Sequence, residues 1–329
     1  MRARAARTPG VEGTRPARPF DAQAFIQVVE VWVPDQRVLR HHSGAYGTHS
    51  QFARHSVTTC FGRGEGLPGA AWASGRVVVW QDLRNRLVSG QPAQAYGPDA
   101  GIAVPIYCGE ALTSVLTIYC GNRTRAGGCI EVWEVQDQAR LVHAGAYYGP
   151  LDEELREQSQ AMQFGCGVGL PGLTWQSGLP FLMDDLPSKK TFARWPLAER
   201  CGLSTGLGIP LYRGGDLSQV LVMLSAQACP IARAFEVWTP DMHGTLRLEQ
   251  ATYGPGLADF ARISRQTWFE PGEGLPGRVS EAARPIVFGN VQAGPFVRHQ
   301  AAEAAGLEIG VGIPVHDGER LRAVVLLLS

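Results

Sequence analysis

The stretch Gly64-Glu-Gly-Leu-Pro-Gly69 decides how the chain is organised, because its last four residues occur three times. The copies of Gly-Leu-Pro-Gly lie at 66–69, 169–172 and 274–277, so their first residues are 103 and 105 positions apart. Glycine and proline restrict the backbone, so the stretch predicts the same tight loop in three places. Recurrence at a fixed spacing is typical of a repeated structural unit.

Two further markers repeat with the same period. Glu-Val-Trp occurs at 30–32, 131–133 and 236–238, and a Gly-x-x-x-Pro element ends at Pro105, Pro210 and Pro314. Because three unrelated markers keep one order and one spacing, the sequence predicts three tandem units. They span 23–121, 128–226 and 230–329 and follow a basic tail at 1–22, which we expect to be disordered.

The third unit shows the expected secondary structure most clearly. Strands are predicted at Ala234–Trp238, Thr245–Thr252, Pro285–Phe288, Gly310–Val315 and Arg322–Leu328. A short helix is predicted at Leu257–Gln266, with helical turns at Arg278–Ala283 and Gln300–Ala305. Each unit is therefore expected to be α+β, with five or six mostly antiparallel strands and short helices on one side.

The order of these motifs resembles the GAF domain, a sensory fold related to PAS domains. The resemblance rests on a Gly-x-Gly-Leu-x-Gly loop, a Ser-Gly turn, an Asp-Leu after a strand, and a Gly-x-x-x-Pro strand start. The second unit keeps these pieces as Gly167–Gly172, Ser177–Pro180, Asp185-Leu186 and Cys201–Leu211. The resemblance covers all three units and implies three tandem GAF/PAS-like domains.

Members of this family usually carry a helix before the first strand and another after the last, and the spacers here leave no room for them. Only nine residues separate Cys120 from Ile130. The closing strands are apolar throughout, as at Val324–Leu328, which is typical of strands buried on both faces. We therefore expect the units to pack on one another, or on a second chain, through their sheets. The alternative is that helices of the Leu257–Gln266 type fold back over that face.

No pattern of catalytic residues recurs in the three units, so we expect a protein that is not an enzyme. The histidines of the first unit lack acidic or cysteine partners at ligand spacing, so no metal site is predicted. None of the seven cysteines recurs in all three units. A GAF-type enzyme that reduces free methionine sulfoxide uses loop cysteines, and here only Cys166 and Cys201 could mimic them. This redox activity is a minor alternative.

The resemblance implies a ligand pocket between the sheet and the segment after the Asp-Leu strand. The matching positions are Trp80, Asp82, Met183, Asp185, Phe192, Phe288, Asn290 and Phe296. The structural alternative is that the polar residues cap the next helix and the aromatic residues belong to the core. We interpret the recurring Trp32, Trp133 and Trp238 as strand core.

The first unit departs most from the other two. Its segment between Asp82 and Gly97 is shorter than the equivalents, so we expect its ligand site to be the degenerate one. The sequence specifies neither the ligand nor a cofactor.

The expected function is that of a bacterial, cytoplasmic, non-enzymatic sensory or regulatory protein. It would bind a small molecule in at least one GAF-like pocket and signal through a partner such as a kinase, a regulator or a second copy of the chain. The alternative is a ligand-free scaffold of degenerate GAF-like domains. Thirty basic and thirty acidic residues leave no net charge for nucleic-acid binding, and no apolar run reaches the ~18 residues of a membrane span.

Overall fold

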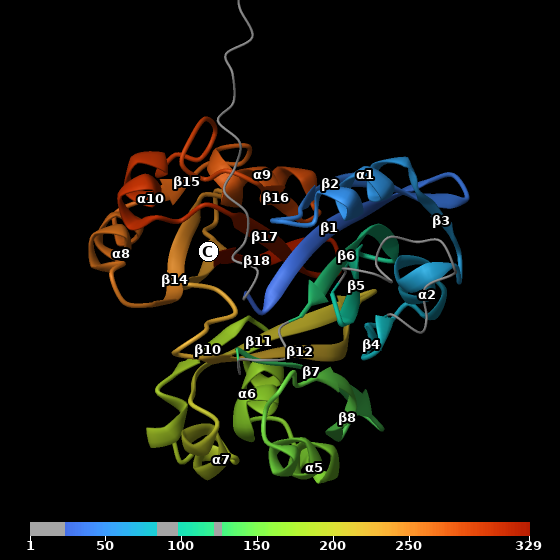
Figure 1. The fold of residues 1–329 in the computed structure, drawn as a ribbon, viewed down its shortest axis with the longest axis vertical. Coiled ribbons are helices and arrows are strands. Elements are labelled where there is room, and N and C mark those ends of the chain that lie inside the picture. Colours follow the sequence, from blue (N-terminus) through green and yellow to red (C-terminus); the bar gives the residue numbers. More distant parts are fainter. Residues whose placement is uncertain (1–23, 84–97, 122–126) are drawn as a thin grey trace, which may run out of the picture.

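The computed structural model describes residues 24–83, 98–121 and 127–329, which form three six-stranded sheets around a common centre (Figure 1). The sheet of domain 1 consists of β1 (Ile26–Asp35), β2 (Val38–Ala45), β3 (Cys60–Gly62), β4 (Val78–Trp80), β5 (Ala100–Cys108) and β6 (Ala111–Cys120). That of domain 2 consists of β7 (Gly128–Gln136), β8 (Arg140–Tyr147), β9 (Gln163–Phe164), β10 (Phe181–Asp184), β11 (Leu203–Arg213) and β12 (Asp216–Ala226). That of domain 3 consists of β13 (Ala234–Pro240), β14 (Leu246–Tyr253), β15 (Trp268–Phe269), β16 (Ile286–Phe288), β17 (Gly310–Asp317) and β18 (Arg320–Leu328). The predicted tail at 1–22 lies outside the described residues.

The three sheets share one topology and one register. In domain 1 the strand order is β3-β2-β1-β6-β5-β4, so the first and last long strands pair at the centre, and the other two sheets match it. Across these central pairs Trp32 faces Val115, Trp133 faces Val220 and Trp238 faces Val324. All pairings are antiparallel, so the predicted α+β class is confirmed.

Short helices cover one face of each sheet, on the outside of the molecule (Figure 1). Domain 1 has α1 (Ser50–Thr58) and α2 (Gly66–Ser74); domain 2 has α5 (Glu153–Ala161), α6 (Gly169–Ser177), the 3-10 turn η1 (Leu186–Ser188) and α7 (Trp195–Arg200); domain 3 has α8 (Ala258–Arg265), α9 (Gly274–Ala282) and α10 (His299–Ala305). Within the described part of the chain, no helix combines the length and the apolar character needed to cross a membrane.

The Gly-Leu-Pro-Gly stretches begin helices, whereas the sequence predicted that they lie wholly in loops. α2, α6 and α9 each start at the first glycine of the stretch. Proline is tolerated there because the amides of the first helical turn have no partner within the helix. The last glycine is required by close packing, since a Cβ at Gly277 would lie 2.0 Å from the carbonyl oxygen of Glu270.

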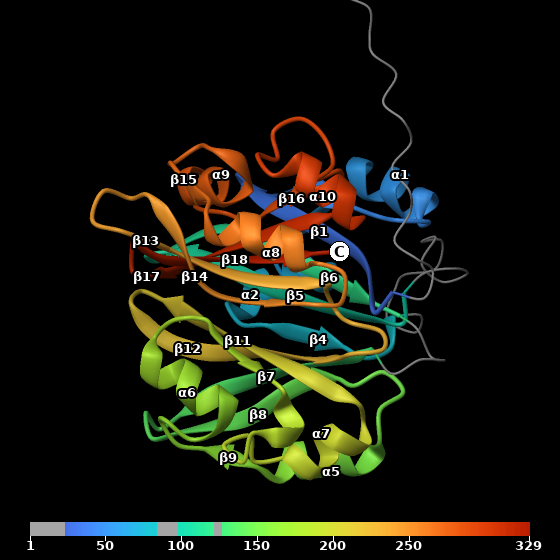
Figure 2. The ribbon, with the colours of Figure 1, turned by 90° about the vertical axis from the view of Figure 1, so that its left-hand side faces the viewer.

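The inner faces of the three sheets pack against one another in a single apolar core. Each domain contributes alternate residues of its central strands, including Val29 and Val31, Ile130 and Val132, and Phe235 and Val237. Strands β5, β11 and β17 contact one another, and the edge strands β4, β10 and β16 contact β8, β14 and β2 of the next domain. The expected packing of sheet on sheet is therefore confirmed. The alternative is wrong, because the helices lie on the outer faces, as Figure 2 also shows.

Polar contacts close the seams between the domains. The side-chain oxygen of Gln219 accepts a hydrogen bond from the Val77 amide at 2.8 Å, and that of Gln250 accepts one from the Leu182 amide at 2.9 Å. At the centre, the Gly109 amide donates to the Gly318 carbonyl at 2.8 Å. Edge-strand groups that would otherwise lack partners are thus satisfied by the neighbouring domain.

Candidate functional site

The outer face of each sheet carries a buried glutamate, which is the first residue of the recurring Glu-Val-Trp. In domain 3, Glu236 of β13 forms a two-pronged ion pair with Arg298, with nitrogen–oxygen distances of 2.6 and 2.8 Å. Domain 2 repeats the pair with Glu131 and Arg194, whose Nη2–Oε2 distance is 2.9 Å. We call each of these a Glu–Arg pair. All four side chains are at most 2% exposed.

Neutral side chains complete the hydrogen bonding of each Glu–Arg pair. In domain 3, Trp238 Nε1 and the Tyr253 hydroxyl donate to Glu236 at 3.0 and 2.8 Å, while Ser264 Oγ accepts from Arg298. In domain 2 the same roles belong to Trp133, Tyr148 and Ser159. A buried ion pair needs such partners, because desolvation otherwise outweighs the attraction between the charges.

Aromatic rings surround the arginine as they would surround a bound cation. The Arg298 guanidinium carbon lies 4.7–5.6 Å from the ring centres of Trp238, Phe260, Phe269 and Phe296. Arg194 lies 5.9 Å from the ring centre of Trp133 and 5.2 Å from that of Phe192. The space between sheet and helices is thus filled by the chain's own arginine in domains 2 and 3.

The charge of the arginine determines how the glutamate titrates. Burial alone would raise the pKa of Glu131, but the charge and hydrogen bonds of Arg194 outweigh burial and lower it. The pKa of Glu236 is lowered in the same way by Arg298. Both glutamates are therefore held in the ionised form.

Domain 1 contains the glutamate without an arginine among the described residues. Glu30 is 0% exposed, and its Oε1 has no hydrogen-bond partner. Its Oε2 accepts a hydrogen bond from Trp32 Nε1 at 3.1 Å. Burial raises the pKa of Glu30 to about 7, although the polar side chains around it, those of Ser56 and Tyr46 first, oppose this rise. Of the three recurring glutamates, Glu30 is therefore the one that has no counter-ion within the described part of the chain.

The sequence agrees with this difference. Arg194 and Arg298 each precede a glycine, Gly202 or Gly306, by eight residues, whereas the residue eight positions before Gly97 is Ser89. Across the sheet from the glutamate, Thr117 and Tyr119 replace the aliphatic residues of the other domains, Val222 and Leu224 or Leu326 and Leu328. Burial and the nearby Glu30 charge both raise the pKa of Tyr119, so its hydroxyl stays protonated.

The eight positions implied by the resemblance fall into two groups. Phe192 and Phe296 are buried against the arginines, and Met183 is 5% exposed in the core of domain 2. Trp80 and Phe288 are partly buried, while Asp82, Asp185 and Asn290 are exposed. The Asp185 carboxylate accepts a hydrogen bond from the Ser188 hydroxyl, and the Asn290 side chain accepts one from the Gln292 amide. Both bonds are local and stabilise turns. In domain 3 the rings of Phe288 and Phe296 contact each other, with 6.5 Å between their centres. The ligand role of all eight positions stays a prediction.

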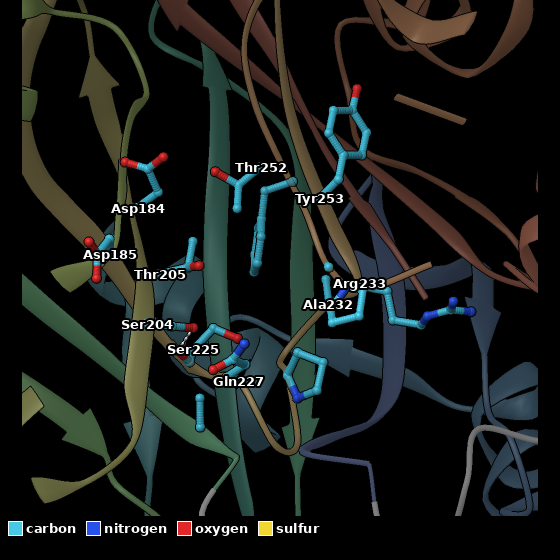
Figure 3. Close-up of a pocket in the computed structure, with 15 residues that line it drawn as sticks. Asp184, Asp185, Ser204, Thr205, Ser225, Gln227, Ala232, Arg233, Thr252 and Tyr253 are labelled. Carbon is cyan, nitrogen blue, oxygen red and sulfur yellow. Dashed lines mark hydrogen bonds between the residues drawn. The ribbon is translucent and has the colours of Figure 1, made fainter. Parts of the chain in front are cut away.

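A cavity of about 380 Å³ lies between domains 2 and 3 (Figure 3). Asp184 and Asp185 lie on one side of it, Arg233 and Tyr253 on the other. Three of its polar groups already bond to the protein: Ser204 Oγ donates to the Ser225 carbonyl, Arg233 donates to the Gly306 carbonyl, and Tyr253 donates to Glu236. We therefore regard this cavity as part of the seam between domains.

The redox alternative would use the thiols of Cys166 and Cys201. Burial raises the pKa of Cys201, which disfavours the reactive thiolate. Cys166 is exposed. Among the described residues, no three His, Cys, Asp or Glu side chains converge as metal ligands.

The recurring glutamate and arginine were not identified as site residues by sequence reasoning. Glu-Val-Trp served only as a repeat marker, although an acid inside an apolar strand recurring at Glu30, Glu131 and Glu236 signals a buried polar site. The tryptophans were interpreted as strand core. All three are at most 1% exposed, which confirms that interpretation. Trp133 and Trp238 also donate hydrogen bonds to the glutamates of the Glu–Arg pairs.

Comparison with known proteins finds partial matches among solved structures. No protein-family profile matches the chain, and no curated protein matches it. Among solved structures, the GAF domain of a phosphoenolpyruvate-protein phosphotransferase from Coxiella burnetii is 21% identical, with a TM-score of 0.26, over 30% of this chain and 57% of that one. A free methionine-R-sulfoxide reductase from Neisseria meningitidis in complex with its substrate is 20% identical, with a TM-score of 0.24, and the match covers 30% of this chain and 52% of that one.

The matched part is thus little more than half of those solved chains. The architecture itself repeats three times here, with the same strand order, register and helix placement in each sheet. The chain therefore consists of three tandem copies of one α+β fold, each a six-stranded antiparallel sheet with short helices on its outer face.

Proposed function

We propose that the chain is a sensory or regulatory protein that binds a small molecule in domain 1 and passes the signal to a partner protein. The observation that supports this is the contrast between Glu30 and the two Glu–Arg pairs. Domains 2 and 3 fill the interior of the fold with Arg194 and Arg298, while the described part of domain 1 leaves Glu30 without a cation. This reverses the expectation that the first unit holds the degenerate site.

The packing of domain 1 also favours a ligand there. Phe61 is partly exposed, whereas its counterparts Phe164 and Phe269 are 2% and 1% exposed. Phe52 is likewise partly exposed, whereas Phe260 is 1% exposed. Apolar rings beside a polar group that lacks a partner are what small-molecule sites usually offer.

We assign domains 2 and 3 the role of a scaffold, because a satisfied ion pair leaves no group free for a ligand. This combines the two functions that the sequence left open, with ligand binding in one domain and structural support in the others. A non-enzymatic, cytoplasmic protein that signals through a kinase, a regulator or a second copy of the chain is part of the same proposal. The shared sheet core supports it, since a change in domain 1 reaches the other domains through direct contacts.

The test is native mass spectrometry of the full chain, as purified and after incubation with a metabolite mixture, followed by hydrogen exchange on the complex. We expect one small molecule per chain and slower exchange in β1 and α1. Slower exchange confined to α8 and β13 would assign the site to domain 3 and contradict the proposal. Absence of any bound molecule would leave the scaffold function for the whole chain.

A further inference from the structure

Resting on that proposed function, we propose that the ligand of domain 1 is a compact monocation, a guanidinium or alkylammonium group, which Glu30 binds. Domain 3 shows what the conserved constellation of side chains holds, and what it holds is the guanidinium of Arg298.

Domain 1 retains six of the side chains that surround the ion pair in domain 3. In domain 3 these side chains are an acid, an indole, a tyrosine, a serine and two phenylalanine rings: Glu236, Trp238, Tyr253, Ser264, Phe260 and Phe269. Their counterparts in domain 1 are Glu30, Trp32, Tyr46, Ser56, Phe52 and Phe61. The indole and the second phenylalanine even meet at nearly the same distance, 4.8 Å between ring centres in domain 1 and 4.9 Å in domain 3.

Within its described residues, domain 1 lacks the positive charge of this constellation and a counterpart of the Phe296 ring. Glu30 Oε1 is buried and has no partner, while Glu236 Oε1 accepts hydrogen bonds from both Tyr253 and Arg298. Leaving a buried carboxylate without a partner costs free energy, and a cation with N–H groups removes that cost. The aromatic rings add the attraction that π-faces offer to cations.

Tyr119 restricts the size of the ligand. The ring centre of Tyr119 lies 5.0 Å from that of Phe52. In domain 3 the guanidinium carbon of Arg298 lies at a similar distance, 4.7 Å, from the ring centre of Phe260, the counterpart of Phe52. Tyr119 therefore takes part of the volume of the arginine head group. The remaining site suits a compact cationic head and disfavours a bulky quaternary one.

The probe is methylguanidinium chloride with the full-length protein. Methylurea, a neutral analogue of similar shape, and sodium chloride at equal ionic strength serve as controls. We expect methylguanidinium to raise the thermal midpoint saturably, by about 4 °C at a hundredfold excess over its Kd. We expect no rise from the controls and none in E30Q, whereas E157Q, which alters an exposed glutamate, should respond as the wild type does.

Proton release gives a second readout that nonspecific stabilisation would not produce. At pH 6 the buried Glu30 holds its proton, so binding of a cation should release close to one proton per ligand. At pH 8.5 the release should fall towards zero. Calorimetry in two buffers of different ionisation enthalpy measures this number directly.

A positive control uses domain 3. The variant R298A should lose stability, and methylguanidinium should restore part of it by taking the place of the missing head group. If R298A is rescued while wild-type domain 1 gives neither a midpoint rise nor proton release, the cation proposal is wrong. If a neutral or anionic metabolite binds domain 1 in the mass-spectrometry experiment instead, the ligand class is wrong while the proposed function stands.

Discussion

Arg298 presents both terminal nitrogens of its guanidinium to the carboxylate of Glu236, at 2.6 and 2.8 Å, and neither side chain is more than 2% exposed. The pair joins the start of α10 to the central strand β13. Because α10 makes its other contacts mainly with α8, the ion pair is a principal link between this helical layer and the sheet.

Removing the arginine alone should therefore destabilise the protein strongly. We expect R298A to lower the free energy of unfolding by about 3–5 kcal/mol, because it leaves Glu236 buried without its counter-ion. R262A breaks only the exposed pair with Asp259 and should cost under about 1 kcal/mol. Urea denaturation of both variants measures the difference, and equal losses would show that the buried pair contributes no more than a surface pair.

Glu30 should make the stability of domain 1 depend on pH in the opposite sense to the Glu–Arg pairs. Its pKa is raised from 4.5 to about 7, so the folded state keeps the proton between these values while the unfolded state loses it. Stability therefore falls as pH rises through this range, by an amount on the order of 3 kcal/mol when complete.

Glutamine has the shape of a protonated glutamate and cannot ionise, so E30Q should remove this dependence. We expect E30Q and the wild type to unfold at similar midpoints at pH 5, and E30Q to be the more stable at pH 8. E236Q serves as the comparison and should be less stable than the wild type at pH 8, since it weakens the pair with Arg298. An E30Q variant that is less stable than the wild type at pH 8 would contradict the unpaired state of Glu30.

Much of the fold could be predicted because its determinants are local and repeated. Glycines at turns, an apolar closing strand such as Val324–Leu328, and the absence of room for flanking helices were sufficient to predict three antiparallel sheets that pack through their faces. The start of α9 at Gly274 was missed, because a proline inside Gly-Leu-Pro-Gly reads as a helix breaker unless it lies in the first turn.

The site was less predictable because it depends on which long side chain folds inward. Glu236 and Arg298 are 62 positions apart, and nothing in the local sequence of either residue indicates that they meet. A comparison of the repeats could have found them. An acid that recurs in all three units, with an arginine at one equivalent position in only two of them, indicates an ion pair in domains 2 and 3 and a difference in domain 1.

Gly277 offers a test of why the glycine motif repeats. An alanine Cβ there would lie 2.0 Å from the Glu270 carbonyl oxygen, so the turn before α9 must open to accept it. We expect G277A to destabilise domain 3 by about 2 kcal/mol or more, as overpacking does. G289A is the matched control, because nothing lies within 4 Å of a Cβ at Gly289. Thermal unfolding that is the same for both variants would mean that the turn is not the reason for the motif.

Separation of the domains should show how far each depends on its neighbours. Residues 128–227, expressed alone, would expose Ile130, Val132, Leu207 and Ile209, which in the full chain lie in the shared core. An apolar sheet face of this kind normally drives association or unfolding. We expect the fragment to be insoluble or to form oligomers, with no cooperative thermal transition as a monomer.

Replacing Val132 and Ile209 with threonine in the fragment should improve its solubility. The same double change in the full chain should destabilise the full chain, because the shared core is then disrupted. Sedimentation and circular dichroism distinguish these states, and a stable monomer of the unmodified fragment would show that the sheets do not need one another.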